Sequence, residues 1–300
     1  MAERNLRVTV IGHVAVDLTT TLDDVELKIV EGKFSNYDRR FQNRLGGTGP
    51  MLALAAREFG CATSVIGKVG ADPFGRIAVA ELQARGIEPL VTATPARATG
   101  TVVMLYLKDD ARILLADRGA NAELGPEDLT AEVRQKLCAS DLVLASGYTF
   151  LDTKAREAVC LAMRIARDAG AFVAFDVVPH TLYRLFPFAE FVALTASAHA
   201  LALELNTARR FLELESHINR AYDEAETAQI VARLLAHYPL LIIYPANDRV
   251  VIADDPHPER WRIQPTGYRA DASADRRAFL DRVFVRTIYE YLSDHRAERG

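Results

Sequence analysis

The chain has 300 residues, of which 50% are hydrophobic and 25% are charged. This length and composition allow a large buried core and exclude a disordered chain. The formal net charge of −4, with no basic stripe, argues against nucleic acid as a partner. No apolar run approaches the ~18 residues of a membrane span. The first residues show no charged-then-apolar leader, so we expect a cytoplasmic protein with no membrane partner.

The cysteines favour the same compartment. Cys61, Cys138 and Cys160 are far apart in the sequence, lie among hydrophobic residues and lack the spacing of zinc ligands. We expect all three to be reduced core residues, with no metal site built from them.

The first part of the chain alternates strand and helix patterns. Residues 6–11 form a β-branched run closed by Gly12, typical of a buried parallel strand. Residues 50–59 carry apolar side chains at helical spacing and stop at a glycine, and residues 63–66 read as the next strand. Asp72-Pro73 then caps a predicted helix that runs to Arg85.

Two segments are expected to form a structure of their own. Residues 17–44 are polar, weakly periodic and too long for a plain loop in a compact domain. Residues 101–107 and 112–116 are β-rich runs on either side of residues 108–111, which predicts a hairpin. Together these pieces predict a small sheet that projects from the main domain.

The rest of the chain resumes the alternation. The predicted strands lie at residues 142–145, 172–175, near 191–194, 240–243 and 250–252, and the predicted helices at 153–169, 224–235 and about 275–292. Strands separated by helices favour an α/β fold with a mostly parallel central sheet covered on both faces. With no linker or repeat, residues 1–300 are expected to form one domain.

Several glycine-containing stretches carry a resemblance to a known family. Residues 46–50 (GGTGP) open a helix, and residues 66–75 (IGKVGADPFG) follow in the order of the first signature of the ribokinase-like, or PfkB, carbohydrate kinases. Residues 99–100, 119–121 (GAN) and 146–148 (SGY) continue the resemblance at suitable intervals. The chain is therefore identified as a divergent member of this family, and the resemblance covers nearly its whole length.

The resemblance implies a three-layer sandwich with a small β lid, made here by segments near residues 17–44 and 97–118. It implies ATP and Mg²⁺ as cofactors if the chain is active, a sugar or nucleoside as ligand, and a homodimer through the lid. Asp17 matches the family's acceptor for a sugar hydroxyl, although a solvated loop aspartate explains it equally well. Gly46 and Gly47 would let the backbone approach the ligand, although a tight turn before a helix has the same pattern. His13, a few residues before Asp17 in the sequence, is expected to be a packed or exposed histidine rather than a catalyst.

The second family signature, Asp-Thr-Thr-Gly-Ala-Gly-Asp-Ala-Phe, is altered. In the family its small residues form an anion hole and its last aspartate is the general base. Aligned without gaps on Phe279, this chain puts Arg277 at the base position. Shifted by two residues, residues 272–274 (ASA) replace the anion hole and Asp275 becomes the candidate catalytic base. The sequence leaves both registers open.

Three other family positions are also changed. Met51 stands where the sugar-site turn usually carries an asparagine. The Asn-x-x-Glu motif of the magnesium network is expected after the strand near residues 191–194, and residues 194–200 (LTASAHA) contain no such pair. The Thr-x-Gly-x-x-Gly nucleotide turn corresponds to residues 244–249 (YPANDR), which have lost both glycines and read as an ordinary hairpin.

These changes leave three hypotheses. The favoured one is a catalytically impaired homologue, a pseudokinase candidate, that keeps a small-molecule site and transfers phosphate weakly or not at all. The alternative is an active ATP-dependent kinase for a sugar or nucleoside, with Asp275 as base. The third is an assembly protein that uses only the lid surface.

Overall fold

The structure is a computed structural model, and it describes residues 5–22, 40–107, 112–214, 222–254, 261–267 and 276–297. Within these residues, nine strands form one large sheet in the order β13-β12-β11-β10-β9-β8-β1-β4-β5. The run from β11 to β5 is parallel throughout, and β12 and β13 add an antiparallel edge. The strands are β1 (Arg7–Ile11), β4 (Ala62–Gly70), β5 (Glu88–Thr94), β8 (Leu142–Ser146), β9 (Phe172–Asp176), β10 (Ala200–Glu204), β11 (Leu240–Ala246), β12 (Arg249–Asp254) and β13 (Arg262–Pro265).

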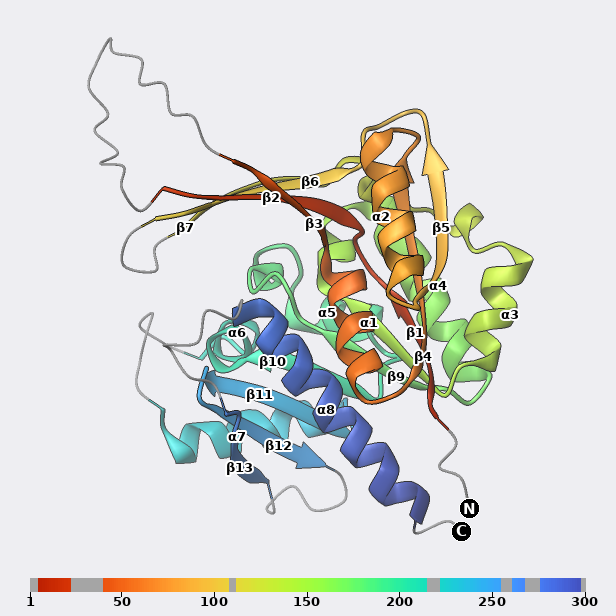
Figure 1. The fold of residues 1–300 in the computed structure, drawn as a ribbon. Helices are drawn as coiled ribbons and strands as arrows, with labels where there is room; N and C mark the ends of the chain where they lie inside the picture. The colour runs from red at the N-terminus through yellow and green to blue at the C-terminus, as the bar shows by residue number, and fades with distance from the viewer. Residues whose placement is uncertain are drawn as a thin grey trace.

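Helices cover both faces of this sheet (Figure 1). One face packs against α1 (Thr48–Glu58), α2 (Pro73–Ala84) and α8 (Arg276–Ala297). The other packs against α3 (Ala131–Ala139), α4 (Thr153–Asp168), α5 (Phe188–Leu194), α6 (Leu205–Phe211) and α7 (Glu224–Leu235).

The strand sequences explain why both faces are covered. In β8, Leu142 and Leu144 belong to the core on the α1 side, whereas Val143 and Ala145 belong to the core on the α4 side. Neighbouring residues of a strand point to opposite faces, so a continuous apolar strand needs two apolar layers. The predicted α/β sandwich is confirmed.

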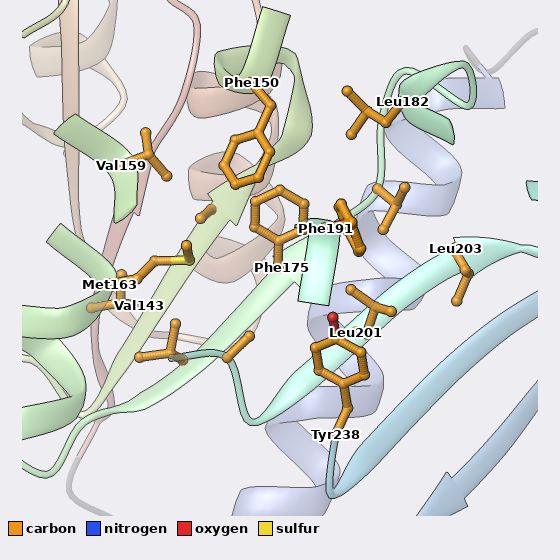
Figure 2. Packing of buried hydrophobic residues seen from close by; sticks show 14 of the residues in the cluster. Val143, Phe150, Val159, Met163, Phe175, Leu182, Phe191, Leu201, Leu203 and Tyr238 are labelled. Atoms are coloured by element: carbon orange, nitrogen blue, oxygen red, sulfur yellow. The ribbon is translucent and has the colours of Figure 1, made fainter. Parts of the chain in front are cut away.

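The core on the α4 side is rich in aromatic side chains. Phe150, Phe175 and Phe191 come from separate elements and meet beneath α4, as Figure 2 shows. The ring centres of Phe150 and Phe175 are 4.7 Å apart, and those of Phe175 and Phe191 are 5.9 Å apart. Tilted and edge-on contacts of this kind stabilise a core beyond the area they bury.

A second, smaller sheet forms the predicted lid. Its four strands within the described residues are in the order β3-β2-β6-β7, and Figure 1 shows this sheet extending away from the body of the molecule. Its strands are β2 (Ala15–Thr21), β3 (Gln42–Gly46), β6 (Gly100–Tyr106) and β7 (Arg112–Asp117). The predicted turn at 108–111 and residues 23–39 of the polar stretch lie outside the described residues.

The predicted helix boundaries agree with the structure where capping residues mark them. Asp72 is the N-cap of α2, and its carboxylate accepts a hydrogen bond from the Gly75 N–H at 2.8 Å. Gly60 and Gly86 follow α1 and α2 with positive φ angles of 75° and 70°, the conformation in which a glycine ends a helix.

Two predictions were wrong. The apolar run at residues 191–194 is the end of helix α5, and the parallel strand of this region is β10. The run packs as a helix because Phe191 is buried against Phe211 while Ala193 is exposed. Cys138 is exposed rather than in the core, whereas Cys61 is buried. Strand β5 and helices α3 and α6 were not predicted.

Candidate functional site at the carboxyl ends of the parallel strands

The glycine turn before α1 packs directly against the first β1–β2 connection. Gly47, the N-cap of α1, has φ of 89°, and a Cβ there would lie 2.2 Å from the His13 carbonyl oxygen. A Cβ on Gly46 would lie 2.0 Å from Oδ1 of Asp17. Only glycine fits both positions. The structure thus brings Asp17, Gly46 and Gly47 together, and their role in ligand binding stays a prediction.

Two buried polar atoms beside this turn have no hydrogen-bond partner among the described residues. They are Nε2 of His13, a residue 8% exposed, and Oγ1 of Thr48 at the start of α1. The His13 ring centre lies 5.9 Å from that of Tyr148. Burial, assisted by the nearby Arg118 guanidinium, lowers the pKa of His13 to about 4, so the imidazole is neutral at pH 7.

Asn121 holds the same connection in place. Its Oδ1 accepts a hydrogen bond from the Val14 N–H at 2.8 Å, and its Nδ2 donates to the Val14 carbonyl at 2.9 Å. The same Nδ2 also donates to the Arg118 carbonyl at 2.9 Å. The side chain therefore substitutes for a strand partner, which explains why the family-like Gly-Ala-Asn stretch occurs here.

Charged side chains occupy the carboxyl ends of β9 and β10. Asp176 ends β9 and is 8% exposed. Burial, together with the nearby Glu204 carboxylate, raises the pKa of Asp176 to about 7. Glu204 ends β10, and its Oε1 lies 3.2 Å from Nε2 of His180.

The correction of the strand position also changes the search for the Asn-x-x-Glu motif. The segment after β10 begins with Asn206, and three residues later comes Arg209 rather than a glutamate. Arg209 is 1% exposed and donates to Glu226 Oε2 at 2.6 Å and to Asn206 Oδ1 at 2.8 Å. The amide is therefore present, contrary to the sequence prediction, but a buried arginine stands where the carboxylate was expected.

The segment that aligns with the nucleotide turn is the hairpin between β11 and β12. Ala246 and Arg249 face each other across the antiparallel pair, and Arg249 Nη2 lies 3.3 Å from Asp248 Oδ2. Pro245 has no N–H to offer a phosphate. Neither Ala246 nor Arg249 has a positive φ angle.

These side chains do not fit the magnesium–ATP complex that the resemblance implies. Arg209 offers no oxygen ligand, and its guanidinium is held against Asn206 Oδ1 at 2.8 Å, so a cation at that oxygen would face a positive charge. Glu204 Oε1 lies 3.2 Å from His180 Nε2. Among the described residues, no group of three or more His, Cys, Asp or Glu side chains could hold a metal ion.

The candidate base cannot be placed. Asp275 and residues 272–274 lie outside the described residues, as does the side chain of Arg277, so both registers of the second signature stay open. Helix α8 begins at Arg276, directly after Asp275 in the sequence.

The structural comparisons define the class of protein. The fold matches an adenosine kinase from Sinorhizobium meliloti with a TM-score of 0.74 and 19% identity, covering 94% of this chain and 87% of that one. It matches a ribokinase from Giardia lamblia with a TM-score of 0.67 and 17% identity, covering 91% and 78%. The fold is therefore ribokinase-like, as the resemblance predicted.

The sequence comparisons identify the family. Residues 5–255 match the pfkB family carbohydrate kinase description, and the chain belongs to this family. A 5-dehydro-2-deoxygluconokinase of Geobacillus thermodenitrificans is 30% identical over 199 residues, which are 63% of this chain and 56% of the relative. The match thus spans little more than half of that relative's length. In the part of the chain that the structure describes, no helix is long and apolar enough to cross a membrane.

His13 is the site residue that sequence reasoning passed over. Its signal in the sequence was its place between Gly12, which closes the first strand, and Asp17. Its burial beside Tyr148 could not be read from that place, because His13 follows β1 and Tyr148 lies in the 3₁₀ turn after β8, far along the chain.

Proposed function

We propose that this protein binds a small polyhydroxy ligand, a sugar or nucleoside, beneath the β lid and transfers phosphate weakly or not at all. The observation that carries the binding is the pair of buried polar atoms at the glycine turn, His13 Nε2 and Thr48 Oγ1, which have no partner among the described residues. A buried polar atom without a partner costs about 1–3 kcal/mol, and a ligand hydroxyl can satisfy it.

The phosphate side supports the weak transfer. Arg209 and Glu226 neutralise each other where a metal-binding carboxylate is expected, and the β11–β12 hairpin lacks the glycines of a nucleotide turn. Phosphoryl transfer depends on cations and N–H groups that stabilise charge on the phosphoryl oxygens. Among the described residues, both the groups that could hold a cation and the glycine N–H groups of a nucleotide turn are reduced.

The test of binding is a thermal-shift panel of sugars and nucleosides, including the substrate for which the Geobacillus relative is named. We expect at least one compound to raise Tm, and the rise to be lost in His13→Ala. The matched control is His237→Ala, a histidine that packs against Phe188 far along the chain and should leave the ligand-induced rise unchanged. A panel with no stabilising compound, or a rise that survives in His13→Ala, contradicts the proposal.

The test of transfer is calorimetric titration with ATP and Mg²⁺, together with an ADP-release assay in the presence of the stabilising compound. We expect no saturable magnesium–nucleotide binding in the micromolar to millimolar range of working substrates. Turnover would favour the alternative, an ATP-dependent sugar or nucleoside kinase.

That alternative has one observation in its favour. The 22-residue helix α8 begins directly after Asp275, and a helix start stabilises negative charge on phosphate. Under this reading Asp275→Ala abolishes ATP-dependent phosphorylation while the thermal unfolding curve stays cooperative. Activity retained in this variant would reject Asp275 as the base.

We also propose that the lid forms the homodimer contact. Phe41, just before β3, is 53% exposed, and Leu115 on β7 is 60% exposed. They lie at the two edge strands of the small sheet, β3 and β7, and the edge of a sheet is a surface on which a second chain can pair. Light scattering should show a dimer that Leu115→Arg dissociates; a monomeric wild-type protein removes this proposal and the assembly hypothesis together.

A further inference from the structure

An open pocket of about 390 Å³ lies at the carboxyl ends of β9 and β10. This volume falls in the range of roughly 300–1,000 Å³ that small-molecule sites occupy. Its lining residues follow β9 on one side and β10 on the other: His180, Tyr183, Arg184, Glu204, Asn206 and Arg210, among others. Tyr183 and Arg184 belong to the 3₁₀ turn Leu182–Arg184, and Arg210 belongs to α6.

Two arginines in this pocket share one aromatic ring. The guanidinium carbon of Arg184 lies 5.7 Å from the centre of the Tyr183 ring, and that of Arg210 lies 6.0 Å from it. Arg184 Nε also donates a hydrogen bond to the Tyr183 hydroxyl at 3.2 Å. These contacts hold both guanidinium groups against one ring in the lining of one pocket, and they reduce the conformational entropy that binding would remove.

The positive charge of this pair is not neutralised by the protein around it. Within the described residues, no carboxylate lies at ion-pair distance from Arg184 or Arg210, and both side chains are exposed. Arg209, the neighbour of Arg210, shows the contrast: it is buried and paired with Glu226 at 2.6 Å. Among the described residues that line the pocket, Glu204 is the acid, and its Oε1 lies 3.2 Å from His180 Nε2.

The chemistry of two guanidinium groups that line one pocket selects the ligand. Planar guanidinium groups bind phosphate oxygens through parallel N–H bonds, and they need no cation to bridge them. A metal-bridged phosphate would need several oxygen ligands, and within the described residues no group of three or more His, Cys, Asp or Glu side chains could hold a metal ion. The pocket therefore suits a phosphate group that arrives without magnesium.

We propose that Arg184 and Arg210 form a metal-independent binding site for the phosphate group of a small phosphorylated molecule. The site goes beyond the neutral-ligand binding proposed under the lid, and it uses different residues. The phosphate could belong to a sugar phosphate or to a free nucleotide, and the two sources are separated by the probes below.

The test is isothermal titration calorimetry of the full chain with inorganic phosphate, ribose 5-phosphate and ATP, each in EDTA and in excess Mg²⁺. We expect saturable binding of at least one probe in EDTA, with an affinity that Mg²⁺ does not improve. Tighter binding of ribose 5-phosphate assigns the site to sugar phosphates, and tighter binding of ATP assigns it to nucleotides. Binding that appears only with Mg²⁺, or no binding of any probe at millimolar concentration, overturns the proposal.

Variants locate the site. Arg184→Gln and Arg210→Gln should each weaken binding about tenfold or more, the loss expected for one charge-assisted hydrogen bond. The matched control is Arg76→Gln, an exposed arginine on α2, which makes the same charge change and should leave the affinity unaltered. Equal effects of all three substitutions would show that binding depends only on net charge, and would reject the site.

The outcome is distinguishable from that of the proposed function. Phosphate binding in EDTA that is lost in Arg210→Gln and kept in His13→Ala supports this site alone. A sugar-induced rise in Tm that is lost in His13→Ala, without phosphate binding, supports the lid site alone.

Discussion

The two halves of the candidate cleft are built from different interactions. Around the glycine turn, backbone packs on backbone: Gly47 touches the His13 carbonyl, and Asn121 bonds the Val14 peptide groups. At the ends of β10 to β12, charged side chains pair with one another, as Arg209 does with Glu226 and Arg249 with Asp248. The first half leaves His13 Nε2 and Thr48 Oγ1 without a partner among the described residues. The second half pairs most of its charges, although no described carboxylate lies at ion-pair distance from Arg184 or Arg210.

The two halves differ in what a substitution would disturb. Close contacts around the glycine turn leave no room for a larger side chain at Gly46 or Gly47. A buried ion pair depends on both partners instead, because removing one leaves the charge of the other uncompensated. The predictions below test this contrast in order of expected effect.

The largest effect is expected at the buried ion pair. Arg209→Met should lower the free energy of unfolding by about 3–5 kcal/mol, because it leaves Glu226 without its partner in a partly buried place. The double variant Arg209→Met, Glu226→Gln should lose much less than the sum of the single changes. Urea unfolding of wild type, the two single variants and the double variant measures the coupling between the two side chains. Additive losses would show that Arg209 and Glu226 do not stabilise each other.

The next effect is expected at the glycine turn. Gly47→Ala should cost about 3 kcal/mol, because it combines a positive φ with a Cβ placed 2.2 Å from the His13 carbonyl oxygen. Gly170→Ala is the matched control, since Gly170 has the same φ of 89° and nothing within 4 Å of an added Cβ. Urea unfolding should show a smaller loss in the control; equal losses would mean that φ alone, and not close packing, requires glycine.

The third effect is a pH dependence at Asp176. Its pKa of about 7 in the folded protein exceeds the usual ~3.9 of the unfolded chain. The folded state therefore binds more protons between these values, and stability falls as pH rises through this window. Asp176→Asn should remove this fall. The difference in unfolding free energy between the variant and wild type should therefore rise by about 2–3 kcal/mol from pH 5 to pH 8, at ~1.4 kcal/mol per pKa unit. A variant whose unfolding free energy runs parallel to wild type over this range would place the Asp176 pKa near normal.

Much of the fold could be predicted because its signals are local. The N-cap at Asp72, the glycines after α1 and α2, and the alternation of apolar runs all depend on residues within one turn or strand. The run at 191–194 was misassigned because four apolar residues suit a strand or a helix end equally well, and only packing on Phe211 decides between them.

The candidate site was less predictable for a related reason. Asp17, Gly46 and Gly47 could be selected through the family resemblance, and the structure brings them together. The pairing of Arg209 with Glu226 joins positions 17 residues apart, and it became visible only once β10 had been placed correctly. Whether Asp275 or Arg277 occupies the position of the base stays open.

The sequence by itself determined the α/β class, the projecting lid and the glycine turn, because periodicity and glycine placement act over a few residues. Only the tertiary structure decided that His13 is buried and neutral, that Arg209 faces Glu226, and that Arg184 and Arg210 meet at Tyr183. These properties arise where separate strands end at one edge of a sheet. Burial and charge pairing at that edge depend on neighbours that are distant along the chain.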